Sequence, residues 1–328
     1  MEKSYDVIAI GDTVVDVFIK LSAGHIEESA QGSLLCLPYG SKIPYEDAIE
    51  IPAVGNSANA AVSASRLGLS TALVTFLGKD EHGAECLTRL QDEKIDTSFI
   101  TQEEGKSTNY HYVLWHGDDR TILIKHSLFT ETLPASLPQP KWIYLSSLGS
   151  HTELFHQEIA TYVKNNPEVK LAFQPGTFQL SMGKDFEIYK QTEVVCMNKE
   201  EAQTLLTTTE SDIQILLSML EALGPKTVII TDGPMGAFMK YNNTYFNMPI
   251  YPDIAPPLER TGAGDAFFST FISYLAKGYD AAHAIKRAPI NSMNVVQHIG
   301  AQEGLLTEAT IEEYIQKAPA NYKLTILE

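Results

Sequence analysis

Short apolar runs alternate with helix-like stretches along most of the chain, and this alternation most constrains the fold. Asn59–Leu67 is a helix-like run of small residues closed by Gly68, and Thr152–Lys164 has helical spacing. Strand–helix alternation predicts an α/β fold, a doubly wound and mostly parallel sheet with helices on both faces. Ligands bind such sheets beyond the carboxyl ends of the strands. The runs that read as buried strands are Tyr5–Ile10, Thr71–Leu77, Trp142–Leu145, Val169–Phe173, Val194–Met197 and Thr227–Thr231.

Two segments depart from this alternation. Residues 13–53 contain Val14–Lys20, which alternates in part with period two, and a stretch rich in Pro, Gly and Tyr. Residues 107–126 read as a hairpin that turns at His116-Gly117-Asp118-Asp119. We expect both segments to form a small β lid on a single domain spanning residues 1–328. An exposed sheet edge in this lid favours pairing between two copies of the chain.

The composition excludes several partners. The formal charge of −17 argues against nucleic acid, whose phosphates need a basic surface. The apolar run Val7–Ile10 is too short for a signal peptide, and no run approaches transmembrane length, so we expect no membrane association. The three cysteines, Cys36, Cys86 and Cys196, are widely separated and form no CxxC motif. This pattern is typical of a reducing compartment, and we expect a cytoplasmic protein.

A glycine loop, Glu259-Arg260-Thr261-Gly262-Ala263-Gly264-Asp265, runs into an apolar-faced helix that we expect to stop at Gly278. A helix N-terminus attracts anions, and glycines let the backbone approach a phosphate closely. Asp265 at this junction has two readings. It is either the cap of the helix or a base beside a reacting phosphoryl group, and the loop alone leaves both open.

Common nucleotide-site motifs are missing. Gly105-Lys106-Ser107 ends like a Walker A loop, but Ile100 stands where the first glycine belongs. The glycine loop lacks the third glycine of a Rossmann fingerprint, because that position is Phe267. No HExxH or GxSxG is present. These absences argue against P-loop kinases, simple dehydrogenases, zincins and α/β-hydrolases.

Four groups of residues occur in an informative order. They are Gly11–Asp16, Val54–Ala61, the pair Asn198–Ala202 and Thr231–Ala237, and the glycine loop followed by Ile299–Gln302. Together they resemble the ribokinase-like carbohydrate and nucleoside kinases of the phosphofructokinase B (PfkB) type. The resemblance covers essentially the whole length. It implies transfer of the γ-phosphoryl group of ATP to an alcohol, usually a sugar hydroxymethyl group.

The resemblance also implies residue roles at the transfer centre. Asp265 would be the catalytic base, and the N–H groups of Gly262, Ala263 and Gly264 would form the anion hole. The residues that match the ATP side are Thr231, Gly233 and Gly236, with Asn291 placed loosely near the adenine and Asn198 near the phosphates.

The resemblance assigns the metal and the acceptor as well. Asn198 and Glu201 match an Asn-x-x-Glu element that positions Mg²⁺ and phosphate, with Glu201 expected to act through water. The alternative reading of this pair is a helix cap and a first-turn glutamate, and the functional reading is favoured. Arg120 has two readings, a substrate contact or an exposed hairpin arginine, and the second is favoured. The residues that match the acceptor side are Asp12, Asp16, Gly55, Asn56 and Asn59, although Asn59 also reads as a satisfied core residue.

The chain departs from the family pattern at three places. Glu259-Arg260-Thr261 stands where the family often has Asp-Thr-Thr, which disfavours a monovalent-cation (K⁺) site without excluding it. Gln174–Thr177 replaces a frequent Asp-Pro-Asn, and the stretch 22–52 is unlike other lids. The acceptor therefore stays open between a sugar or polyol and a nucleoside. From other classes, a catalytically inactive ligand-binding regulator and a NAD-binding dehydrogenase are the alternatives.

Overall fold

The computed structural model describes residues 4–29, 32–117 and 119–327. Within these residues the centre of the fold is a ten-stranded sheet, which is parallel from β7 to β13 and antiparallel beyond. This confirms the predicted doubly wound, mostly parallel sheet. In spatial order the strands are β16 (Thr325–Ile326), β15 (Thr244–Met248), β14 (Ala237–Tyr241), β13 (Thr227–Thr231), β12 (Val194–Asn198), β11 (Lys170–Phe173), β10 (Trp142–Leu145), β1 (Val7–Ile10), β6 (Thr71–Gly78) and β7 (Ile100–Glu103).

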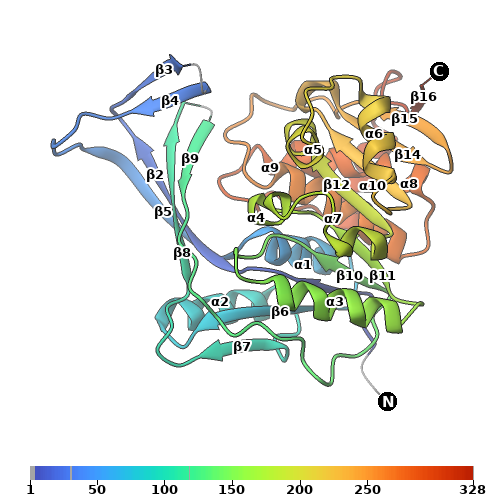
Figure 1. The fold of residues 1–328 in the computed structure, drawn as a ribbon. Helices are drawn as coiled ribbons and strands as arrows, with labels where there is room; N and C mark the ends of the chain where they lie inside the picture. The colour runs from blue at the N-terminus through green and yellow to red at the C-terminus, as the bar shows by residue number, and fades with distance from the viewer. Residues whose placement is uncertain (1–3, 30–31, 118, 328) are drawn as a thin grey trace.

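Helices cover both faces of this sheet (Figure 1). In β1, Val7 and Ala9 point into one core while Ile8 and Ile10 point into the other, as the period of a strand requires. The first core packs against α1 (Asn56–Arg66), α2 (Glu81–Asp92), α7 (Ala263–Ala276), α8 (Ala281–Ile285), α9 (Ala288–Val295) and α10 (Glu308–Gln316). The second packs against α3 (Glu153–Asn165), α4 (Thr177–Ser181), α5 (Lys199–Leu206) and α6 (Ile213–Glu221). No helix among the described residues combines the length and apolar character that crossing a bilayer demands.

A separate four-stranded sheet projects from the α/β body (Figure 1). Strands β2 and β8 pair in parallel at its centre, so the two segments expected in the lid do lie together. Asp118, in the expected hairpin turn, lies outside the described residues. The strands are β5 (Tyr45–Val54), β2 (Val14–Leu21), β8 (Asn109–His116) and β9 (Asp119–Leu123), with a further hairpin of β3 (His25–Ser29) and β4 (Gly32–Cys36).

The carboxyl ends of the parallel strands position the candidate site. Asp12 follows β1 closely and Gln174 follows β11, while Asn198 and Thr231 are the last residues of β12 and β13. Parallel strands end at the same edge of a sheet, so these side chains gather there. Helix α7 begins at this edge, because its residue Asp265 is hydrogen-bonded to Gln174.

Candidate active site

Helix α7 begins with Gly262 as its N-cap, in a left-handed conformation with φ 80°. A Cβ at this position would lie 2.3 Å from the Cβ of Ala301, so both the backbone and the packing require glycine. Asp265 is the third residue of the helix. The reading of Asp265 as the helix cap is therefore wrong, because glycine occupies that position.

The carboxylate of Asp265 is instead held by two amide groups. Asn59 Nδ2 donates to Asp265 Oδ2 at 2.8 Å, and Gln174 Nε2 donates to Asp265 Oδ1 at 2.9 Å. Burial raises the pKa of Asp265, and the two amide hydrogen bonds partly oppose this rise. The result is a buried, oriented carboxylate with a greater affinity for a proton than an ordinary aspartate.

Two charged residues of the lid sheet act on Asp265. The positive charge of Arg120 on β9 lowers the pKa of Asp265, and the negative charge of Asp16 on β2 raises it. Arg120 is half-buried, which corrects the favoured reading of an exposed hairpin arginine. The lid therefore contributes charge to the same site as α7.

The first N–H groups of α7 are available to bind an anion. Within the described chain, the N–H groups of Gly262 and Gly264 donate to no acceptor, and Ala263 makes only a long contact of 3.5 Å to the Arg260 carbonyl. Unpaired N–H groups at a helix start attract negative charge. These are the three groups expected to form the anion hole.

A cavity of about 340 Å³ opens beside this helix start. Its lining includes Thr231, Gly233 and Gly236 from the β13–β14 connection, and Ala263 and Gly264 from α7. Three of the expected ATP-side residues and part of the glycine loop thus face one cavity, whereas Asn198 does not line it. A wider hollow of about 690 Å³ lies between α3 and the 3₁₀ turn Glu187–Gln191, and none of the expected site residues lines it.

Asn291 does not line this cavity, although its neighbour Ser292 does. Asn291 is fully buried in α9, where its Nδ2 donates to Thr270 Oγ1 and its Oδ1 accepts from the N–H of Leu306. Both polar atoms of its side chain are satisfied inside the protein. Asn291 is therefore placed in the core and not against the candidate nucleotide cavity, contrary to its expected role near the adenine.

Asn198 and Glu201 form a reciprocal capping box at the start of α5. Asn198 Oδ1 accepts from the N–H of Glu201, and Glu201 Oε2 accepts from the N–H of Asn198, both at 2.8 Å. The capping reading is therefore correct for both residues. Burial raises the pKa of Glu201, and the negative charge of Asp265 adds to this rise. The second carboxylate oxygen of Glu201 lies outside the box, and an oxygen donor on this half-buried side chain fits a hard cation such as Mg²⁺.

Two histidines of the lid side lie against the expected acceptor carboxylates, and sequence reasoning missed both. His126 Nδ1 lies 3.0 Å from Asp12 Oδ2, and His111 Nδ1 lies 3.5 Å from Asp16 Oδ1. The two imidazole rings are 5.4 Å apart. Neither histidine–aspartate contact has hydrogen-bond geometry, so Asp12 Oδ2 and Asp16 Oδ1 are buried oxygens without a hydrogen-bond partner among the described residues. The other ring nitrogen of His111, Nε2, is also buried without such a partner there.

The start of α1 completes this side of the site. Gly55, with φ 111°, lets the helix start pack against Asp12, whose carbonyl oxygen would lie 2.6 Å from an added Cβ. Asn56 is half-buried, and its side chain makes no hydrogen bond among the described residues. Asn59 is buried and bonded through both polar atoms, to Asp265 and to Gln302. Asn59 therefore holds Asp265 from within the core, while the second hydrogen of its Nδ2 has no acceptor among the described residues, and its contact with the acceptor stays a prediction.

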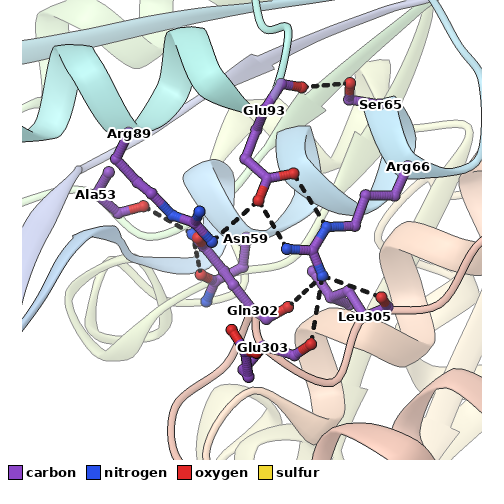
Figure 2. A network of polar contacts seen from close by, with 9 residues as sticks. All are labelled: Ala53, Asn59, Ser65, Arg66, Arg89, Glu93, Gln302, Glu303 and Leu305. Carbon is purple, nitrogen blue, oxygen red and sulfur yellow. Dashed lines mark hydrogen bonds and ion pairs between the residues drawn. The ribbon is translucent and has the colours of Figure 1, made fainter.

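Sequence reasoning also missed the roles of Gln174, Gln302 and Glu259. Two signals point to Gln174, its place directly after a strand at the ligand-binding edge and its departure from the family pattern at Gln174–Thr177. The signal for Gln302 is its place in the segment downstream of the glycine loop. Figure 2 shows it between Asn59 and the guanidinium group of Arg66.

Comparison with known proteins gives consistent results. The sequence profile described as "pfkB family carbohydrate kinase" matches residues 3–308. The ribokinase of Bacillus subtilis (strain 168) is 26% identical over 267 residues, which cover 80% of this chain and 87% of that protein.

Solved structures share the fold. The structure of Arabidopsis thaliana ribokinase complexed with ribose and ATP superimposes with a TM-score of 0.81 at 17% identity, covering 96% of this chain and 99% of that one. The Methanocaldococcus jannaschii nucleoside kinase gives a TM-score of 0.77 at 19% identity, over 95% and 98% of the two chains. On the extent of the sequence match, this chain belongs to the pfkB family of carbohydrate kinases.

Proposed function

We propose that the protein transfers the γ-phosphoryl group of ATP to a hydroxyl group of a sugar or sugar-like polyol. One observation carries the proposal. A buried carboxylate, Asp265, lies in the first turn of a helix whose start, at Ala263 and Gly264, has unpaired N–H groups beside a cavity of about 340 Å³. Attack of an alcohol on a phosphoryl group requires a base and an anion-binding site next to each other.

In this reaction Asp265 accepts the proton of the acceptor hydroxyl as its oxygen bonds to the γ-phosphorus. The bond from that phosphorus to the bridging oxygen breaks, and ADP leaves. The N–H groups of Gly262, Ala263 and Gly264 stabilise the charge on the transferred group. The raised pKa of Asp265, caused mainly by burial, suits a proton acceptor.

The nucleotide would occupy the cavity of about 340 Å³ that Thr231, Gly233 and Gly236 line. Mg²⁺ would be held by Glu201 through water and by Asn198. When bound, it neutralises phosphate charge. The oxygen-donor chemistry of these two side chains supports this assignment, and the capping box keeps both side chains fixed.

The acceptor would lie between the lid and the start of α1. Asp12 and Asp16 there have buried oxygens without hydrogen-bond partners. Burying an unsatisfied polar group costs about 1–3 kcal/mol, so hydroxyl donors of a polyol would relieve this cost. Asn56 and the two lid histidines supply further donors and acceptors.

The test is ADP release with a panel of sugars, polyols and nucleosides, for the wild type and Asp265→Asn. We expect at least one sugar or polyol to give turnover that falls 10²-fold or more in the variant, about the contribution of a general base. Turnover with nucleosides alone would identify a nucleoside kinase, as in the M. jannaschii structural relative. If ligands raise the Tm but no acceptor gives Asp265-dependent turnover, the protein is a binding regulator.

A further inference from the structure

Both hydrogen bonds to Asp265 come from side-chain amides, those of Asn59 and Gln174, and an amide can adopt two orientations at the same position. A side-chain amide has an NH₂ end and an oxygen end of nearly the same shape, so it can present either one to a neighbour. With the oxygen end turned toward Asp265, Asn59 and Gln174 would repel the carboxylate. These two amides can therefore hold the Asp265 carboxylate only if other residues fix their NH₂ groups toward it.

Two neighbouring side chains hydrogen-bond the far ends of these amides. The hydroxyl of Tyr144 donates to Gln174 Oε1, and in this arrangement the NH₂ group of Gln174 faces Asp265. Gln302 Nε2 donates to Asn59 Oδ1 at 3.0 Å, which turns the NH₂ group of Asn59 toward Asp265. Each amide is thus oriented by a donor on its far side.

The orienting residues are themselves held. Gln302 Nε2 also donates to the carbonyl of Ala53 at 2.7 Å, which uses both of its hydrogens. The loop that carries Gln302 is fixed by Arg66, whose guanidinium group donates to the carbonyls of Gln302 and Leu305 and to the carboxylate of Glu93 (Figure 2). All three of Tyr144, Asn59 and Gln302 are buried.

The same loop also holds the anion side of the site. The N–H of Gly300 donates to Glu259 Oε1 at 2.9 Å, and the N–H of Thr261 donates to Glu259 Oε2 at 2.6 Å. Ala301 packs directly against Gly262. The segment Gly300–Gln302 therefore contacts both halves of the transfer site.

We propose that Gln174 and Gln302 are positioning residues of the phosphoryl-transfer site, Gln174 by holding Asp265 directly and Gln302 by orienting Asn59. The kinetic part of this proposal rests on the proposed function, and the structural part does not.

The first test uses thermal unfolding and needs no acceptor. Gln174→Leu removes a donor that favours the ionised form of Asp265, so the variant should lose less Tm at pH 5 than at pH 8, where more of Asp265 is ionised. In the Asp265→Asn background the loss should not change with pH. Other charged or titratable groups that act on Asp265 or feel its charge are Asp16, Arg120, Tyr144, Cys196 and Glu201, and all are present in both backgrounds.

The matched control is Gln179→Leu. Gln179 is a buried glutamine whose Nε2 donates to the Ser146 carbonyl and lies 3.1 Å from His156 Nε2, and it makes no hydrogen bond with Asp265. Its loss of Tm follows the titration of His156, so at each pH it should be the same in the wild-type and Asp265→Asn backgrounds. A pH-independent loss for Gln174→Leu in both backgrounds would overturn the direct part of the proposal.

The second test uses kinetics with an acceptor that supports turnover. Gln174→Leu and Gln302→Met should lower kcat by about 10-fold or more while the KM for ATP changes less than about twofold. The acidic limb of the kcat–pH profile should move to higher pH by about one unit in Gln174→Leu, less in Gln302→Met, and not in Gln179→Leu. An unchanged limb in both variants would refute the positioning role. If the wild type has no turnover, the proposed function fails, and the unfolding series still decides whether Gln174 holds Asp265.

Discussion

The carboxylate of Glu259 joins the glycine loop to Gly300, whose N–H donates to Glu259 Oε1 at 2.9 Å. The other oxygen accepts the N–H of Thr261 at 2.6 Å. Both oxygens of this buried side chain are used inside the protein. We therefore expect turnover that does not require K⁺, because the loop is already held by Glu259. Replacing K⁺ by tetramethylammonium at constant ionic strength should change kcat less than about twofold, and a loss of 10-fold or more would contradict this prediction.

Replacing Gly262 by alanine should damage the loop by steric overlap as well as backbone strain. Gly278 is the matched control, since its φ of 90° is similar to the 80° of Gly262 but nothing lies within 4 Å of an added Cβ. Gly278→Ala should lower the free energy of unfolding by about 1–2 kcal/mol, the cost of a left-handed alanine. Gly262→Ala should cost more and lower kcat. Adding Ala301→Gly should recover part of both losses, and equal effects of the two single variants would argue against the overlap.

Arg66 should be important to stability because it pairs with Glu93 in a largely buried setting. Their side chains are 20% and 12% exposed, and the pair is 2.7 Å apart. Arg66→Ala should reduce the free energy of unfolding by about 3 kcal/mol at pH 7, as expected when a buried pair loses one partner. The hydrogen bond from Arg66 lowers the pKa of Glu93 below 4.5. This stabilisation is present above that value and is lost as the pH falls through the lowered pKa.

Arg89→Ala is the control for this pair, because Arg89 contacts the same carboxylate at 3.0 Å but is 33% exposed. A more exposed ion pair contributes about 0–1 kcal/mol. Urea unfolding at pH 7 and pH 4 measures both variants. Equal losses for the two arginines would show that burial does not set the contribution of Arg66.

The three cysteines should differ sharply in reactivity. Burial raises the pKa of Cys86 to about 12, and that of Cys196 well above its usual value. Cys36 is half-buried on β4, and its pKa is raised too, by desolvation and by Glu27. Access therefore separates the three, and at pH 8 an aromatic disulfide reagent should modify Cys36 alone in the native protein. All three should react in guanidinium chloride, and Cys36→Ser should abolish the native reaction. Rapid modification of Cys86 would contradict the buried position.

The central sheet was largely predictable because its strands are buried on both faces. Trp142–Leu145 and Thr227–Thr231 read as continuous apolar runs, and the observed strands have the same bounds. The lid strands β3 and β5 were not foreseen. β3 is mostly polar and fully exposed, and β5 has three charged residues and becomes buried only at its last two positions, so neither shows the apolar pattern that marks a buried strand.

The site residues that belong to a local sequence motif were predictable, and those brought together only by tertiary contacts were not. Asp265 follows from the glycine loop, but its partners Asn59 and Gln174 lie 206 and 91 residues away in sequence. His111 lies beside Asp16 only because β2 and β8 pair in parallel with these residues in register. No local pattern in the sequence specifies that register.

The place of β1 in the sheet affects how the protein is made. β1 lies between β6 and β10, so during synthesis it has no neighbour in the sheet until Thr71–Gly78 emerges, and none on its other side until Trp142–Leu145 follows. Asp265 joins Asn59 and Gln174 later still. Contacts so distant in sequence slow folding. Nascent chains that stop short of α7 would therefore expose apolar strands while lacking Asp265. Early release of such chains would lead to aggregation and would give no partial activity.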